Sequence, residues 1–115
     1  MQTYAKSKLL GNVGNIEFFN ENVQGKNPFC VLSLATSKTW KKASGESAEK
    51  TQWHRVVILI KNLVELAKNR IKVGTGLIVE GTLSINTYTD DKGVTHNRPE
   101  TVLGNFNSLL SVINR

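Results

Sequence analysis

The sequence predicts a single all-β domain, a small barrel that carries one short helix. Its 115 residues can enclose one hydrophobic core but not two. Five runs of β-prone residues are separated by turn-forming segments. Only one segment has the apolar spacing of an amphipathic helix. We therefore expect residues 1–115 to form one strand-rich domain.

Three strands are predicted in the first half of the chain. Residues 8–19 read as a strand that glycines bend, and a polar turn region over 20–27 precedes a second strand at 29–36. The segment 41–50 (KKASGESAEK) has no periodicity and many small polar residues, which predicts an exposed, mobile loop. A third strand follows over 52–61.

One helix of about ten residues is predicted after the third strand. Asn62 has the side chain of a helix N-cap, and Glu65 would occupy the third helical position. Gly74 suits the end of the helix. The apolar stripe consists of Leu63, Leu66, Ala67 and Ile71.

Two further strands complete the predicted barrel. Leu77 to Ile85 reads as a strand with a bend or bulge at Gly81. Residues 90–93 (DDKG) form a hairpin turn signal, and the last strand is expected from Thr101 through Phe106 to Leu109. Three strands, a helix and two strands is the layout of the five-stranded OB-fold, a Greek-key barrel whose groove commonly binds single-stranded nucleic acid.

The charge of the chain favours a polyanionic partner. Lys and Arg total 15 against nine acids, which gives a net charge of +6, and no acid follows Glu100. Ribosomal, membrane-surface and merely soluble basic proteins share such a balance, so charge alone does not single out nucleic acid.

The single cysteine and the hydropathy pattern exclude two protein classes. Cys30 has no partner for an internal disulfide, which argues against a secreted disulfide scaffold, and its apolar surroundings predict a buried, inert thiol. No run approaches the ~20 apolar residues of a membrane span, and residues 1–10 lack the core of a secretory signal. We expect a cytoplasmic, nucleoid-associated protein, or one of an organelle matrix or a mobile element.

The segment 51–60 (TQWHRVVILI) carries the strongest functional signal. Alternate side chains of a strand share one face, so Trp53, Arg55, Val57 and Leu59 point together. An aromatic ring beside a guanidinium offers a stacking plane for a base and a charge for the adjacent phosphate. Trp40 repeats that chemistry among Lys38, Lys41 and Lys42. The pattern predicts single-stranded nucleic-acid binding, although tryptophans are also common in cores.

Motifs of catalysis, cofactors and metals are absent from the sequence. It contains no phosphate-binding loop, no HExxH and no cysteine pair for zinc, and its only histidines are His54 and His96. The GNVG at 11–14 fits the GxxG loop of KH domains, but it lies in a β-prone segment. Glu80 with Asp90 and Asp91 could suggest a carboxylate site, but paired turn aspartates are more often turn chemistry. We expect no cofactor and no enzyme.

Several ordered motifs resemble the bacterial and mitochondrial single-stranded DNA-binding protein (SSB) family. Trp53-His54-Arg55 and Glu80-Gly81 carry the resemblance most directly, and it extends from Leu9 to about Val102. The segments that match in order are 10–14, 33–40, 51–58, the helix with its exit at 66–74, and 78–83. The resemblance implies an OB-fold that binds single-stranded DNA.

The resemblance also implies roles for individual residues. Trp40, Trp53 and Tyr88 occupy positions of base-stacking aromatics, with Tyr88 in place of a common tryptophan, and Leu59 replaces a stacking phenylalanine. His54 matches a histidine of the subunit interface, so a homotetramer is implied. The hairpin at 84–87 lacks the basic residues of some members, and the sequence ends at Asn114-Arg115 without an acidic tip. Recruitment of replication and repair enzymes through such a tip is therefore not expected.

Eight cations are candidates for phosphate contacts, and Arg55 and Lys42 are the foremost because each neighbours a stacking candidate. Charged residues are usually just a solvated face, so we expect about half of the set to do nothing specific. The full set is Lys8, Lys38, Lys41, Lys42, Arg55, Lys61, Arg70 and Lys72.

The sequence thus predicts a protein that coats and protects single-stranded DNA during replication, repair and recombination, without sequence preference. An alternative on the same fold is a dimeric, primosome-type accessory protein that binds single strands and replication partners. A third hypothesis is a small basic nuclease or RNA-processing enzyme.

Overall fold

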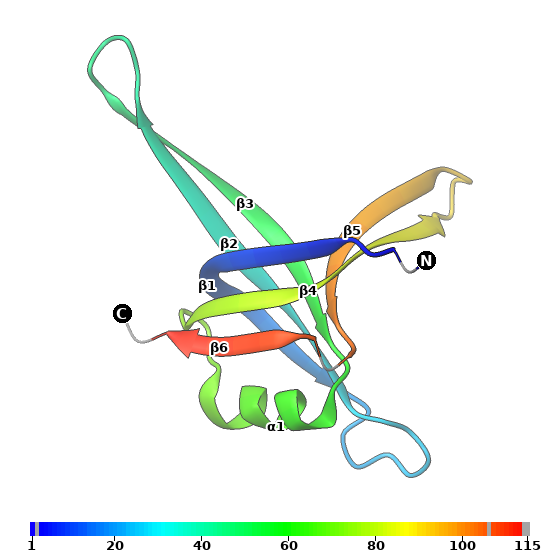
Figure 1. The fold of residues 1–115 in the computed structure, drawn as a ribbon. Coiled ribbons are helices and arrows are strands. Elements are labelled where there is room, and N and C mark those ends of the chain that lie inside the picture. Colours follow the sequence, from blue (N-terminus) through cyan, green and yellow to red (C-terminus); the bar gives the residue numbers. More distant parts are fainter. Residues whose placement is uncertain (2, 106, 114–115) are drawn as a thin grey trace.

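A computed structural model describes residues 1, 3–105 and 107–113 of the chain. Within them the chain forms six strands and one helix (Figure 1). In order they are β1 (Lys6–Phe19), β2 (Phe29–Lys41), β3 (Ser47–Ile58), α1 (Lys61–Arg70), β4 (Gly76–Thr89), β5 (Thr95–Leu103) and β6 (Leu109–Ile113).

Five strands close into a barrel because β1 pairs with two partners. Its first half, Lys6 to Asn12, pairs antiparallel with β4, and its second half, to Phe19, pairs antiparallel with β2. The circuit continues from β2 to β3, from β3 to a parallel β5, and from β5 back to β4. The predicted five-stranded OB-fold is confirmed, with β6 added along β4.

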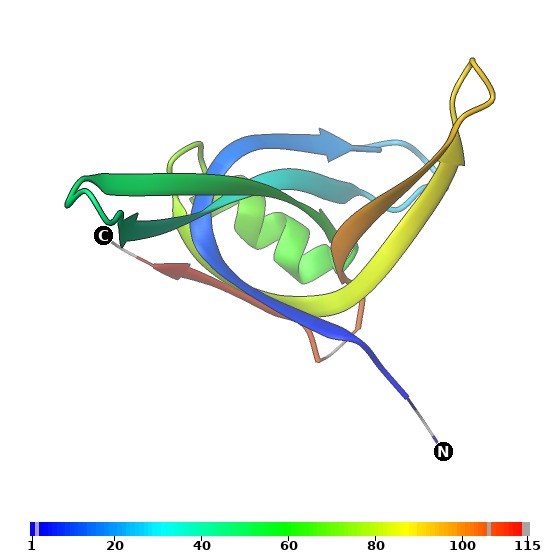
Figure 2. The ribbon, with the colours of Figure 1, turned by 90° about the horizontal axis from the view of Figure 1, so that it is seen from above.

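Glycine lets β1 bend sharply where it changes partner. A methyl group at Gly11 would lie 2.1 Å from the carbonyl oxygen of Ala35, so the two backbones meet only without a side chain there. A register shift follows between Val13 and Asn15. The curled β1 is plain when the barrel is seen from above (Figure 2).

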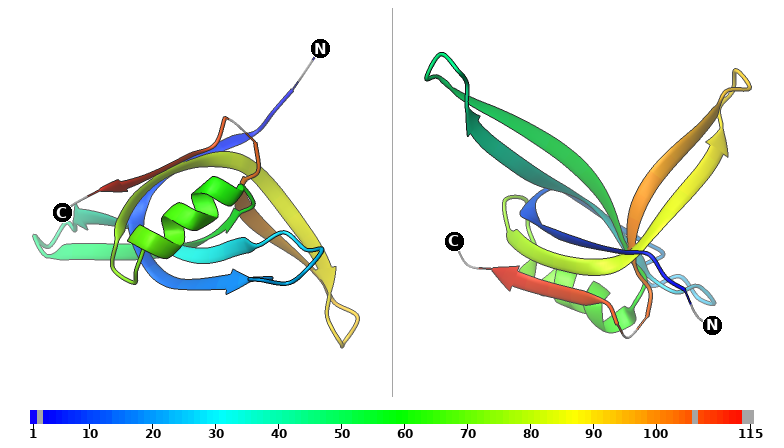
Figure 3. Two further views of the ribbon diagram at one scale, coloured as in Figure 1. Left: turned by 90° about the horizontal axis from the view of Figure 1, so that it is seen from below. Right: turned by 45° about the horizontal axis from the view of Figure 1, so that its top comes forward.

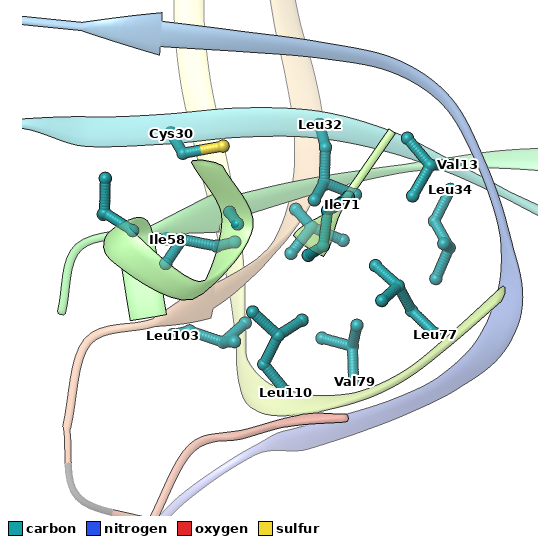
Figure 4. Packing of buried hydrophobic residues seen from close by; sticks show 13 residues of the cluster. Val13, Cys30, Leu32, Leu34, Ile58, Ile71, Leu77, Val79, Leu103 and Leu110 are labelled. Atoms are coloured by element: carbon teal, nitrogen blue, oxygen red, sulfur yellow. The ribbon is translucent and has the colours of Figure 1, made fainter. Parts of the chain in front are cut away.

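Apolar side chains from the inner faces of the strands fill the barrel (Figure 4). The buried strand residues are Val13, Cys30, Leu32, Leu34, Val56, Ile58, Leu77, Val79, Leu103 and Leu110. From α1 and its end, Val64, Ala67 and Ile71 close one end of the barrel (Figure 3, left). The predicted helical stripe is confirmed in part, because Leu63 and Leu66 pack at its edge.

Cys30 lies fully buried in this core. Burial raises the pKa of its thiol to about 11, because the apolar surroundings disfavour the charged thiolate. This favours the protonated thiol at neutral pH, and the prediction of a buried cysteine is confirmed.

Two hairpins extend beyond the barrel as diverging arms (Figure 3, right). The β2–β3 arm stays paired out to Lys41 and Ser47, and its turn is closed by the Gly45 N–H on the Lys42 carbonyl. The segment 41–50 is largely exposed as expected, but the expectation of a loop over its whole length was wrong, because residues 47–50 belong to β3. Small polar residues here face solvent on both sides of a ribbon, so they carry no period that a sequence could reveal.

The β4–β5 arm was also longer than expected. β4 runs past Ile85 to Thr89, and β5 begins at Thr95 and ends at Leu103. The predicted hairpin turn at 90–93 is confirmed, whereas the predicted last strand over 101–109 was wrong. Phe106, part of that prediction, lies outside the described residues. Gly81 makes no bulge: a methyl group there would lie 2.7 Å from the Val102 carbonyl oxygen, so close packing requires glycine.

The helix begins two residues earlier than its sequence signals suggested. Ile60 is the N-cap and makes no side-chain cap hydrogen bond, so the prediction of Asn62 as the cap was wrong. The helix ends at Arg70, and Gly74 instead forms a later turn with φ of 95°. There its N–H donates to the Val13 carbonyl at 2.7 Å, which ties the turn to β1.

Candidate nucleic-acid interface

Trp53 lies on the outer face of β3 with 61% of its surface exposed. Its indole crosses β2 and reaches β1, where a methyl group at Gly14 would lie 2.2 Å from Cζ3 of the ring. Because Gly14 has no side chain, the indole ring can lie directly on the sheet at this position. An indole seated in this way leaves a π-surface free for a base.

Arg55 is the next outward residue of β3, and it is paired rather than free. Its Nε donates to Oε2 of Glu100 at 2.5 Å, across the parallel β3–β5 pairing that sets these residues opposite each other. Arg98 Nε lies 3.7 Å from the same carboxylate oxygen. The Glu100 side chain is only 12% exposed, so one carboxylate holds two guanidinium groups at the surface.

Tyr88, on the β4–β5 arm, lies against two cross-strand neighbours. Its ring stacks on His96 with centroids 5.1 Å apart and an interplanar angle of 22°. The guanidinium carbon of Arg98 lies 5.2 Å from the ring centroid. Tyr88 is 44% exposed, so an edge or face of this stack meets solvent.

The turn of this arm is organised by Asp90. Its Oδ1 accepts the backbone N–H groups of Lys92 and Val94, each at 2.9 Å, and its Oδ2 lies 2.7 Å from Nε2 of His96. The hydrogen bond from His96, followed by that from the Val94 N–H, lowers the pKa of Asp90 below its ordinary value. The interpretation of this aspartate as turn chemistry is confirmed.

These side chains share one face of the sheet, and we call them the aromatic–arginine track. The register places Arg55 opposite Glu100, and Tyr88 opposite His96, while alternate residues of β5 point the same way. A groove of about 610 Å³ adjoins the track and is lined by Trp53, Arg55, Arg98 and Glu100 among others. The track consists of Trp53, Arg55, Glu100, Arg98, Tyr88 and His96.

Sequence reasoning missed Arg98 and His96. The signal was present, because counting outward from the turn at 90–93 pairs Tyr88 with His96 and Asn86 with Arg98. Two-residue alternation then places His96, Arg98 and Glu100 on the face of Tyr88. The last strand was expected to begin only at Thr101, so both residues fell outside it.

Trp40 lies on the opposite face of the β2–β3 arm from Trp53. The unbroken register sets Trp40 opposite Ala48 and Trp53 opposite Ala35, and residues 40 and 35 point to different sides of β2. Trp40 is 43% exposed, and Lys38, Lys41 and Lys42 lie on the same arm. One subunit therefore carries two aromatic platforms on two faces.

The other predicted cations lie apart from both platforms. Lys8 is on the outer side of β1 opposite Glu80, whereas Lys61, Arg70 and Lys72 lie in α1 or just beyond it, at the end of the molecule away from the arms (Figure 1). The structure thus brings Arg55 to Trp53 and three lysines to the arm of Trp40. The remaining four predicted cations lie near neither tryptophan.

His54 points inward from β3 and is half-buried. Its Nε2 lies 2.8 Å from the hydroxyl of Thr36 on the neighbouring strand. Leu59 is exposed on the outer face beyond Arg55. A subunit-interface role for His54 stays a prediction.

Within the described residues, no group of three or more His, Cys, Asp or Glu side chains is placed to hold a metal ion. None of the helices described there is long and apolar enough to span a membrane.

An OB barrel with exposed aromatic rings and guanidinium groups on its grooved face defines a binding module for single-stranded nucleic acid. The model of the Single-strand binding protein family matches residues 5–109. The chain therefore belongs to the single-strand binding protein family, and the sequence prediction of a single-stranded DNA-binding protein is confirmed.

Relatives come from bacteria and from mitochondria. A single-stranded DNA-binding protein of Rickettsia typhi is 39% identical over 106 residues, which are 91% of this chain and 69% of that protein. A mitochondrial single-stranded DNA-binding protein of Xenopus laevis is 34% identical over 96 residues, which are 77% of this chain and 65% of the relative.

Solved structures share the fold. The Plasmodium falciparum SSB in complex with ssDNA aligns with a TM-score of 0.82 and 26% identity, covering 99% of this chain and 98% of the other. A small single-stranded DNA-binding protein from Streptomyces coelicolor aligns with a TM-score of 0.71 over 97% of this chain, and at 16% identity it shows the fold alone.

Proposed function

We propose that single-stranded DNA lies along the aromatic–arginine track. Bases stack on Trp53 and Tyr88, while the guanidinium groups of Arg55 and Arg98 contact phosphates between them. Stacking on an aromatic ring contributes about 1–3 kcal/mol per base and tolerates any base. The observation that carries the proposal is the common face: it holds two exposed rings and two guanidinium groups, and Trp53, Arg55 and Arg98 of this set border one groove. The Plasmodium falciparum structure, solved with ssDNA, supports this ligand class.

The β2–β3 arm supplies the second platform. Trp40 stacks a base, and Lys38, Lys41 and Lys42 contact phosphates of the same strand or of a neighbouring stretch. Because Trp40 faces away from Trp53, the strand reaches both only by passing around the arm or by meeting arms of different subunits. The proposal therefore implies a wrapped path rather than a straight one.

A homotetramer accounts for one feature that a single barrel leaves unexplained. Leu10 and Leu109 are exposed on the outer face of the β1–β4–β6 sheet, which also carries the half-buried Ile78 and the charged Lys8 and Glu80. Exposed apolar side chains grouped on a sheet face are typical of a subunit contact. A dimeric accessory protein would cover the same sheet face with two subunits instead of four. The measured native mass therefore distinguishes the two assemblies.

The role we propose is binding without catalysis: the coated strand is kept from re-pairing and from nucleases during replication, repair and recombination. The relatives place such proteins in bacteria and in mitochondria, so we infer a location in the bacterial cytoplasm or an organelle matrix.

Titration of the protein with oligo(dT), followed by tryptophan fluorescence, tests the proposal. We expect quenching and saturable binding, retained when duplex DNA of equal length competes, because paired bases cannot lie on the rings. Equal competition by duplex and single-stranded DNA would contradict the proposal, because it would show that the interface binds DNA only through its positive charge. Cleavage of a labelled strand with magnesium would instead support the nuclease hypothesis.

A further inference from the structure

Glu100 places a negative charge in the middle of a surface proposed to bind a polyanion. Its Oε2 accepts from Arg55 Nε at 2.5 Å and lies 3.7 Å from Arg98 Nε. The carboxylate is largely buried, while both arginine side chains stay partly exposed. Among the residues that the structure describes, the shielded Nε of Arg98 has no hydrogen-bond partner.

The charges at this point do not cancel. Two guanidinium groups share one carboxylate, which leaves a net positive charge and one incompletely bonded guanidinium. A phosphodiester also carries one negative charge and accepts hydrogen bonds from arginine in the same forked geometry as a carboxylate. A backbone phosphate at the groove would therefore bind the same two groups that Glu100 binds.

We propose that Glu100 is an internal competitor for a backbone phosphate of the bound strand. In the free protein its carboxylate holds Arg55 and Arg98 on the track between Trp53 and Tyr88. When the DNA strand binds, a phosphate accepts hydrogen bonds from one or both guanidinium groups. Glu100 then loses part of its own hydrogen bonding to these arginines. Glu100 thus keeps the arginines in position but lowers the affinity that they could give. The inference rests on the function proposed above.

Glu100→Gln tests the inference, because it removes the charge and keeps the size of the side chain. The matched control is Glu21→Gln, which removes the same charge from a glutamate paired with Lys68, on a loop at the α1 end of the molecule away from the arms. Binding to oligo(dT) is measured over a range of salt for both variants and for the unmodified protein. Thermal unfolding reports whether each variant stays folded.

Glu100→Gln should bind more tightly at low salt, with a slope of log affinity on log salt steeper by roughly 0.7, the value for one further phosphate contact. The gain should shrink about threefold between ~50 and ~200 mM salt, while Glu21→Gln follows the unmodified protein. Weaker binding by Glu100→Gln, or a slope equal to that of Glu21→Gln, overturns the inference.

A second variant keeps the inference testable if Glu100→Gln does not fold. In Arg98→Gln the pair between Arg55 and Glu100 remains, but one phosphate partner is lost. We expect a slope shallower by roughly 0.7, and an unchanged slope contradicts the role of Arg98. If the unmodified protein does not bind oligo(dT) at all, the proposed function fails rather than this inference.

Discussion

The position of the Trp53 ring depends on a residue that has no side chain. Gly14 lies under the indole, and the space there admits hydrogen but no carbon atom. Sequence patterns did not reveal that Gly14 lies under Trp53, because the contact joins β1 to β3 across β2. The position of the Trp53 ring thus depends on the pairing of three strands and cannot be read from one strand alone.

Gly14→Ala should displace the Trp53 ring and weaken oligo(dT) binding by an amount on the order of the 1–3 kcal/mol stacking contribution. In a Trp53→Ala background the same substitution should change binding little, because no ring remains to be displaced. Fluorescence titration of the four proteins in this cycle measures the coupling.

Gly104→Ala is the matched control, because a methyl group there meets only ordinary contacts of 3.5 Å or more. Equal losses from the two alanines, or a full Gly14→Ala loss without Trp53, would show that the glycine supports the fold and not the ring.

The two arms belong to the scale of secondary-structure elements. Their outer halves are ribbons that extend away from the barrel, and most of their residues are exposed and polar. Each arm carries an aromatic ring near cations. Strand register brings Tyr88 of β4 to Arg98 of β5, whereas Trp40 shares β2 with Lys38 and Lys41 and precedes Lys42 in the turn. The arms, rather than the barrel, therefore determine how far along the molecule a bound DNA strand can make contacts.

For the β2–β3 arm we predict a change in salt dependence. Replacement of Lys38, Lys41 and Lys42 by glutamine should make the slope of log affinity on log salt shallower by roughly 2, at 0.7 for each lost phosphate contact. The comparison protein carries Lys61, Arg70 and Lys72 as glutamine, with the same change in charge. A similar slope change in both proteins would contradict the assignment of phosphate contacts to the arm.

For the β4–β5 arm we predict a pH effect through Asp90. The pKa of this carboxyl is lowered in the folded protein by its hydrogen bond from His96, so its contribution to stability is present above its ordinary value of 3.8 and is lost as pH falls through the lower folded pKa. Asp90→Asn should remove this part of the pH dependence.

Chemical shifts of His96 and Tyr88 during an acid titration report the arm directly. We expect both residues to shift with the titration of Asp90 in the unmodified protein and not in Asp90→Asn. Identical acid titrations in the two proteins would contradict the assigned hydrogen bond.

At the scale of the whole molecule, the sequence predicted the barrel better than the arms. Inward residues such as Leu32, Leu34, Val56 and Ile58 alternate cleanly, because one face of each strand is buried. Beyond the barrel both faces of each strand meet solvent, so segments such as 41–50 show no alternation of apolar and polar residues. The predicted helix cap was wrong for a local reason, since Ile60, in extended conformation two residues after β3, precedes α1 without any polar side chain.

The site was predicted in its parts but not in its arrangement. Trp53, Tyr88 and Trp40 are exposed as expected. The sequence did not reveal that Trp40 faces the other way, that Glu100 pairs with Arg55, or that Arg98 joins the track. Each of these depends on strand register, and strand ends were the least certain part of the prediction.

Assembly gives a further prediction at this scale. Leu10→Arg should lower the native mass, because an arginine in place of this exposed leucine would lose its hydration if another subunit covered the β1–β4–β6 sheet, and that loss destabilises the assembly. Val73→Arg is the control, since Val73 is exposed on the turn after α1. Native mass spectrometry should give four subunits for the unmodified protein and for Val73→Arg. Two subunits in the unmodified protein would favour the dimeric accessory protein.

The affinity of Trp53→Ala for oligo(dT) tests the central claim most directly, with Trp53→Phe as the variant that keeps a π-face. We predict a loss of about 5- to 150-fold for alanine, the equivalent of 1–3 kcal/mol, and a smaller loss for phenylalanine, with unfolding temperatures unchanged. An unaltered affinity in folded Trp53→Ala would contradict the claim that unpaired bases lie on this ring.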